Sequence, residues 1–123
     1  MTKTLRLYAA VLGCTGVAAG AFGAHALKDE LEQRGALGYW NTAVMYHLLH
    51  ATAMVGLHAA STAAGTSKGP YRMAGHLMMA GTTMFSGSLY CLALGVGPKA
   101  VMGPATPVGG LLMICGWAVL GFW

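Results

Sequence analysis

The stretch that decides the fold is residues 39–62, YWNTAVMYHLLHATAMVGLHAAST, in which three histidines interrupt a run of alanine, leucine, valine and methionine. It contains no Lys, Arg, Asp or Glu. A helix needs about 20 predominantly apolar residues to cross a hydrocarbon layer of about 30 Å. The length of this run and its lack of charge therefore predict a helix that spans a membrane.

Three more runs have the same character, and the composition agrees with them. Hydrophobic residues make up 56% of the 123-residue chain and charged residues only 8%, which is unlike a water-soluble domain of this length. Lipid cannot satisfy backbone polar groups, and the runs lack the period-two alternation of a barrel strand, so the spans must be helices. We predict one all-α transmembrane domain over residues 1–123, a four-helix bundle with spans at 6–27, 39–62, 71–95 and 106–123. The first run is expected to be a span and not a cleaved secretory signal.

All three acidic residues lie in the connection between the first two spans, KDELEQR at 28–34. Asp29 is expected to cap a short interfacial helix there. His25, at the end of the first span, is expected to act as a C-terminal cap that pairs with these acids, because it meets the negative end of the helix dipole. Trp40 falls near a span end, where aromatic rings anchor helices at the headgroups.

The formal net charge of +4 is spread over every connection. There is no basic patch, which argues against nucleic-acid binding. One side of the membrane would receive Lys3, Arg6, Lys68 and Arg72, and the other Lys28, Arg34 and Lys99. Short loops rich in Lys and Arg stay in the cytoplasm, so both termini are predicted to be cytoplasmic. The expected partners are the lipid bilayer and other membrane proteins or a second copy of the chain.

Small residues predict where helices approach one another. Gly16 and Gly20 are four residues apart, and Gly13 and Gly23 extend them into a stripe along the first span. The last span repeats glycine at a seven-residue interval. We expect these stripes to pack against neighbouring helices of the same chain.

Two polar stripes follow from the 100° that separates successive residues of a helix. His47, His50 and His58 lie on one face of the second span, and His76, Ser86 and Tyr90 on one face of the third. The short connection makes these spans antiparallel neighbours, so His47 reaches the depth of Ser86 to Tyr90, and His58 the depth of His76. An unpaired polar group in hydrocarbon costs several kcal/mol. The stripes should therefore face each other in a polar seam that consists of His47, His50, Ser86 and Tyr90.

The polar seam has several interpretations. It can simply fix the helix register, or it can bind a quinone or a similar lipid-soluble molecule, or a proton or small solute can pass along it. Neutral imidazoles also bind haem or a metal, and His58 with His76 is then the best pair. No carboxylate or cysteine stands nearby, so copper is the metal that suits such a set best. No catalytic constellation is visible, so an enzyme is not favoured.

Several motifs resemble those of a known family. They are GAFGAHAL at 20–27, WNTAVMYH at 40–47, FSGSLY at 85–90, TPVGG at 106–110 and GW at 116–117. In this order and spacing they resemble the domain-of-unknown-function 423 family, which includes YgdD-like proteins and the animal transmembrane protein 256. The resemblance implies a small multi-pass protein of the bacterial inner membrane, or of mitochondria, and brings no established reaction with it.

The polar seam and His25 fall on motif positions of that family, whereas His58 and His76 do not. The expected function is therefore that of a non-enzymatic accessory or scaffold component of the membrane. The alternative is a redox or ligand-binding membrane protein that holds haem, copper or a quinone in the polar seam.

Overall fold

The computed structural model describes residues 2–66 and 68–122, which form five helices. They are α1 (Thr2–Ala24), α2 (Lys28–Gln33), α3 (Leu37–Ala63), α4 (Pro70–Leu94) and α5 (Lys99–Phe122). These ranges contain no β-strand. The predicted all-α class is correct.

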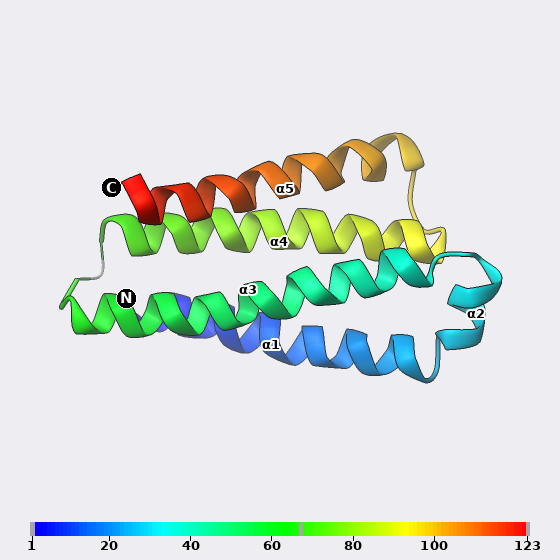
Figure 1. Ribbon diagram of the computed structural model, residues 1–123, viewed down its shortest axis with the longest axis horizontal. Coiled ribbons are helices and arrows are strands. Elements are labelled where there is room, and N and C mark those ends of the chain that lie inside the picture. The colour runs from blue at the N-terminus through cyan, green and yellow to red at the C-terminus, as the bar shows by residue number, and fades with distance from the viewer. Residues whose placement is uncertain (1, 67, 123) are drawn as a thin grey trace.

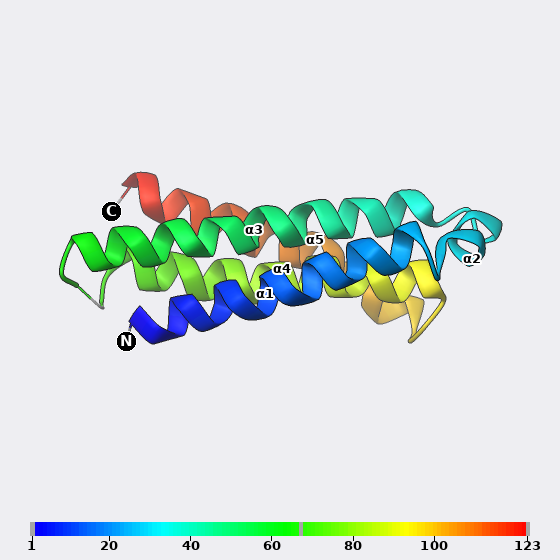
Figure 2. The same cartoon turned by 90° about the horizontal axis from the view of Figure 1, so that it is seen from below.

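The four long helices lie side by side in the order α1, α3, α4, α5 (Figure 1). α1 packs on α3, α3 on α4 and α4 on α5. The expected four-helix bundle must be corrected to five helices among the described residues, in which α1 packs mainly on α3 and α5 mainly on α4, with further contacts between α1 and α4 and between α3 and α5. A view from below shows α1 and α5 crossing the α3–α4 pair obliquely (Figure 2).

Three helical segments are long and apolar enough to cross a membrane: Lys3–Ala24, Pro70–Leu94 and Lys99–Phe122. α3, which contains the expected span 39–62, has 27 residues but is not among them. Its histidines and hydroxyl side chains lower its mean hydropathy. The chain is thus a helical membrane protein in which α3 and α4 share the buried polar side chains, with His47, His50 and Ser61 on α3 and Thr82, Ser86 and Ser88 on α4.

The predicted start of the last helix is wrong. α5 begins at Lys99 and not near residue 106, and Pro104 and Pro107 lie inside it. Proline has a φ that fits a helix, but inside a helix it removes one backbone hydrogen bond and its ring crowds the carbonyl four residues earlier. Between the two prolines, the Thr106 hydroxyl donates to the Met102 carbonyl at 3.1 Å. α4, by contrast, lies close to the predicted span 71–95: it begins at Pro70 and ends at Leu94, and the C-cap residue Gly95 has a left-handed φ of 66°.

The expected caps around α2 are not formed. Leu27 is the N-cap residue of α2 and makes no side-chain cap bond, so the prediction that Asp29 caps this helix is wrong. Asp29 lies in the first turn instead, where a carboxylate interacts favourably with the helix dipole. His25 is exposed in the turn after α1, and no ion pair joins it to the acidic residues within 2–66 and 68–122. Glu30 pairs with Arg34 at 3.1 Å.

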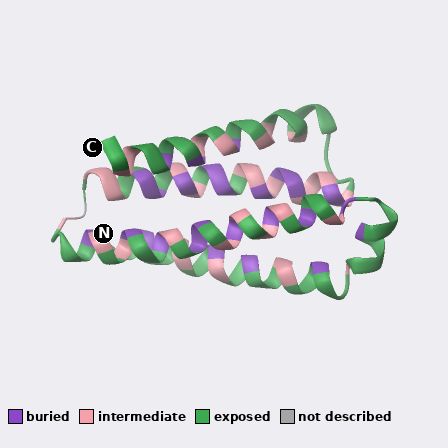
Figure 3. Cartoon of the chain, viewed as in Figure 1, coloured by how far each residue is buried: buried purple, intermediate pink, exposed green. Residues whose placement is uncertain are grey.

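Glycines permit the close contacts between helices. A Cβ added to Gly16 would lie 2.8 Å from Leu48 on α3, so the expected packing of this stripe within the chain is confirmed there. A Cβ on Gly13 would meet nothing within 4 Å. At the α4–α5 contact, a Cβ on Gly109 would lie 2.7 Å from the carbonyl oxygen of Gly81. The outer faces of α1 and α5 are largely exposed, and the buried residues follow the facing sides of the helices (Figure 3).

Candidate functional site

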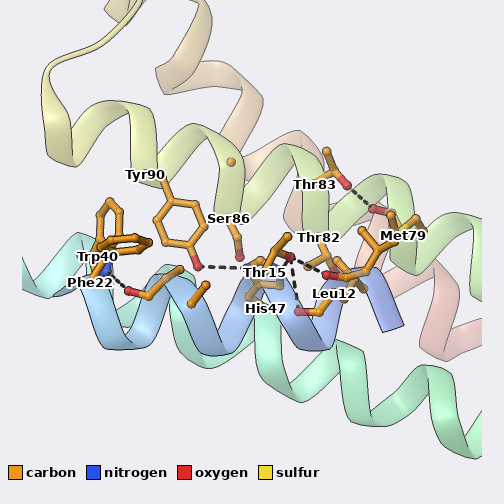
Figure 4. Close-up of a pocket in the computed structure, with 14 residues that line it drawn as sticks. Leu12, Thr15, Phe22, Trp40, His47, Met79, Thr82, Thr83, Ser86 and Tyr90 are labelled. Carbon is orange, nitrogen blue, oxygen red and sulfur yellow. Dashed lines mark hydrogen bonds between the residues drawn. The ribbon is translucent and has the colours of Figure 1, made fainter. Parts of the chain in front are cut away.

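His47 joins three helices through its two ring nitrogens (Figure 4). From α3, its Nδ1 lies 3.0 Å from the Tyr90 hydroxyl on α4. Its Nε2 lies 2.9 Å from the Thr15 hydroxyl on α1. The Thr15 hydroxyl in turn donates to the Val11 carbonyl at 2.6 Å. One imidazole therefore fixes the relative positions of α1, α3 and α4.

The donor and the acceptor of each hydrogen bond can be assigned from this series of linked bonds. Because Thr15 donates its only hydroxyl hydrogen to a carbonyl, it must accept from His47, whose Nε2 then carries the ring hydrogen. Nδ1 is left as an acceptor, and the Tyr90 hydroxyl donates to it. The result is a neutral imidazole in one defined tautomer with both nitrogens used.

His50 joins two helices, α3 and α5, and has the opposite tautomer. Its Nδ1 lies 2.8 Å from the Tyr46 carbonyl, which can only accept, so Nδ1 carries the hydrogen. The Trp117 indole N–H on α5 donates to its Nε2 at 3.2 Å. His50 is 2% exposed. This imidazole is thus turned toward α5 and is also fully satisfied.

The structure brings together only part of the polar seam. His47 and Tyr90 are in hydrogen-bond contact, and Ser86 lies on the same side of α4. Ser86 donates to the Ala43 carbonyl at 2.8 Å and not to a histidine. His50 has its partners on α3 and α5 rather than on α4. The four residues therefore serve three separate contacts.

Trp40 lies in the interior and not at a headgroup boundary. It is 6% exposed, and its indole N–H donates to the Ala19 carbonyl on α1 at 2.8 Å. Its ring lies 4.6 Å, between centroids, from that of Tyr90 on α4. The expectation of an interfacial anchor is replaced by a second contact that joins α1, α3 and α4.

The alternative pair, His58 and His76, has other surroundings. His76 Nδ1 lies 2.9 Å from the Tyr8 hydroxyl, and the Arg72 Nε–H donates to His76 Nε2 at 3.3 Å. Nδ1 of His58 is buried without a hydrogen-bond partner. Within residues 2–66 and 68–122, no three His, Cys, Asp or Glu side chains gather in an arrangement that would hold a metal ion.

A groove of about 550 Å³ lies between α1 and α4, with Trp40 and His47 of α3 at its base. Its walls are almost entirely apolar and include Val11, Leu12, Ala18, Phe22 and Met79. Figure 4 shows the Thr15–His47–Tyr90 chain running along this groove. Such a groove, apolar with a few convergent polar groups, is typical of a binding site for a small molecule.

Known proteins resemble this chain over nearly its whole length. The family described as Protein of unknown function (DUF423) matches residues 19–110. The chain belongs to this family. Two similar relatives are membrane proteins of the UPF0382 group, one from Schizosaccharomyces pombe (37% identity, 91% of this chain and 93% of the relative) and one from Staphylococcus epidermidis (37%, 96% and 92%). The UPF0382 inner membrane protein YgdD of Escherichia coli is 37% identical (97% and 87%). No solved structure gives a significant match.

Two residues that bond the interior histidines of this DUF423 protein, Thr15 and Trp117, were not among the predicted site residues. Both lie outside the matched segment 19–110. A signal was present for Trp117, since an indole N–H in a membrane-spanning helix needs a hydrogen-bond acceptor and its helix offers few side-chain acceptors. Thr15 gave no comparable signal, because a threonine in a membrane helix can satisfy itself on its own backbone, as Thr15 partly does.

Proposed function

We propose that this DUF423 protein is a non-enzymatic accessory or scaffold component of the bacterial inner membrane, with α1, α3, α4 and α5 as four spans of a single domain. The observation that carries the proposal is that both interior histidines use both ring nitrogens inside the chain. Their bonds connect all four long helices: His47 connects α1, α3 and α4, and His50 connects α3 and α5. The name of the Escherichia coli relative supports the inner membrane as the location.

The arrangement of α3 supports the proposal of four spans. α3 contacts both α1 and α4, each of which is long and apolar enough to cross a membrane. A 27-residue helix is about 40 Å long at 1.5 Å per residue, which is sufficient for a hydrocarbon core of about 30 Å. The ring nitrogens of His47 and His50 are all hydrogen-bonded within the protein, and the exposed Thr52 and Thr62 hydroxyls donate to carbonyls of their own helix, so lipid need not solvate these groups. α2, with its acidic residues exposed, would then lie at the headgroups.

The second candidate function is the binding of a lipid-soluble ligand, which the groove between α1 and α4 supports. Haem and copper fit less well than a quinone-like molecule. To ligate iron or copper, His47 or His50 would have to give up one of its two hydrogen bonds. A hydrogen-bonding ligand in the groove requires no such loss.

One purification tests the accessory role against a redox role with haem or copper. Protein extracted from native membranes in mild detergent is expected to show no Soret band and no stoichiometric copper, and to migrate on a native gel in a complex larger than the single chain. Absorption spectra, elemental analysis and native electrophoresis measure these properties. A stoichiometric haem or copper would overturn the accessory role, as would migration of the extracted protein as a bare monomer.

We further propose that both termini face the cytoplasm. The termini and the α3–α4 turn lie at one end of the four long helices, and α2 lies at the other (Figure 1). The terminal end carries four cations and no acidic residue among residues 2–66 and 68–122, and the α2 end carries three cations beside all three acids.

The orientation can be tested by labelling single cysteines in intact bacteria with a membrane-impermeant maleimide. In a variant with Cys14, Cys91 and Cys115 replaced by alanine, Gln33→Cys should react from outside. Ala64→Cys should react only after the membrane is permeabilised. Both positions are exposed and neither substitution changes a charge. The opposite pattern of labelling would reverse the orientation.

A further inference from the structure

The groove between α1 and α4 is closed at both ends. At one end the Tyr8 hydroxyl on α1 lies 2.9 Å from His76 Nδ1 on α4. Leu5 of α1 also packs against Gly75 of α4, so closely that a Cβ on this glycine would clash with it. At the other end Trp40 joins α1 to α3 and contacts Tyr90. Between these contacts the two helices separate and leave about 550 Å³, a volume within the range of small-ligand sites.

The groove is unsuited to a charged ligand. None of its lining residues is Lys, Arg, Asp or Glu, and its imidazole is neutral in the hydrogen-bonded arrangement above. Val11 and Phe22, at its rim on α1, are 43% and 56% exposed and belong to a helix that is apolar enough to lie in lipid. An occupant must therefore be neutral and enter from the hydrocarbon phase.

Every side-chain polar hydrogen that borders the groove is already donated. The Thr15, Thr83 and Ser86 hydroxyls donate to backbone carbonyls, and the Thr82 hydroxyl points to the Met113 sulfur. The Trp40 N–H, the His47 Nε2–H and the Tyr90 O–H are also used. What remains for an occupant is a set of oxygen lone pairs, so the groove is matched to a ligand that donates a hydrogen bond.

The Tyr90 oxygen is the best placed of these acceptors. It donates its hydrogen to His47 and accepts from no residue among 2–66 and 68–122. Donation along the chain Tyr90–His47–Thr15 polarises the phenolic oxygen and strengthens it as an acceptor. The rings of Tyr90, Trp40 and Phe22 all line the same groove, so an aromatic head group can pack beside this oxygen.

We propose that the groove binds a neutral, lipid-soluble phenol, such as a hydroquinone with an alkyl tail, whose hydroxyl donates to the Tyr90 oxygen. The proposal deepens the ligand-binding candidate above and rests on it. The reduced, donating form of a quinone-like ligand is preferred over the oxidised form, because the oxidised form carries only acceptors and would face acceptors in the groove.

The test compares two probes that differ in one hydrogen-bond donor, 4-decylphenol and its methyl ether, 4-decylanisole. Calorimetric titration of the full chain in lipid nanodiscs, corrected with empty nanodiscs, is expected to give saturable binding that is about fivefold tighter for the phenol. Tyr90→Phe should remove this difference while leaving the affinity for the ether unchanged. Equal affinities of the wild-type protein for the two probes would mean that hydrocarbon alone fills the groove and would overturn the proposal.

A groove-filling variant provides the second arm. A Cβ on Gly87, which lines the groove, would meet nothing within 4 Å, so Gly87→Leu should fold normally and abolish saturable phenol binding. Gly13→Leu is the matched control, because Gly13 also has open space around its Cα but does not line the groove. Undiminished binding to Gly87→Leu would place the phenol elsewhere and overturn the proposal. The accessory role is tested by the metal content of the protein and by its migration on a native gel. Neither the comparison of the two probes nor the groove-filling variant depends on these measurements.

Discussion

Replacing Gly109 by leucine is expected to lower the free energy of unfolding by about 3 kcal/mol, because leucine cannot fit between the backbones of α4 and α5. A Cβ at this position would lie 2.7 Å from the Gly81 carbonyl oxygen and 2.9 Å from the Phe85 Cα. These are backbone atoms of an adjacent helix, so no rotamer change relieves the clash. The helices would have to move apart, and their packing, which is the principal force between membrane helices, would be lost.

The measurement is unfolding of the purified protein by titration of SDS into mixed micelles. Gly110→Leu is the control, since a Cβ there meets only the Phe85 ring at 3.8 Å, an ordinary contact distance. The control should change stability by less than about 1 kcal/mol, because leucine is also the better helix former. Equal losses in the two variants would contradict the tight α4–α5 contact.

The sequence was sufficient for the contact of His47 on α3 with Tyr90 on α4, and insufficient for the partners of His50 and Ser86 and for the contacts of α1 and α5. The turn between Ala63 and Pro70 is short, so depth along α3 and α4 can be counted outward from it, and this places His47 opposite Tyr90. α1 is separated from α3 by α2 and two turns, and α5 can slide and rotate against α4. The register of α1 and α5 therefore depends on glycine packing and cannot be obtained by counting residues from a short turn. This register brings Thr15 to His47 and Trp117 to His50.

Two errors at helix ends have a common origin. The last span was expected to begin at residue 106, and Trp40 was expected to anchor a span end at the headgroups. Pro104 lies inside α5, because a helix in contact with a partner tolerates one missing N–H. Trp40 is buried, because its N–H finds the Ala19 carbonyl and its ring finds Tyr90. Composition predicts that a helix exists. The hydrogen-bond partners available to each polar group decide where that helix ends.

Replacing His50 by leucine is expected to lower the free energy of unfolding by about 1.5 kcal/mol, since it leaves the Trp117 N–H without its acceptor. In a cycle with Trp117→Phe, measured by the same SDS titration, the two changes should be coupled by about 1 kcal/mol. His58→Leu provides a control on the same helix. Nδ1 of His58 is buried without a partner, so leucine there should leave the stability unchanged or raise it. Similar losses in His50→Leu and His58→Leu, or additive effects in the cycle, would show that the histidine is retained for its size and not for its bond to α5.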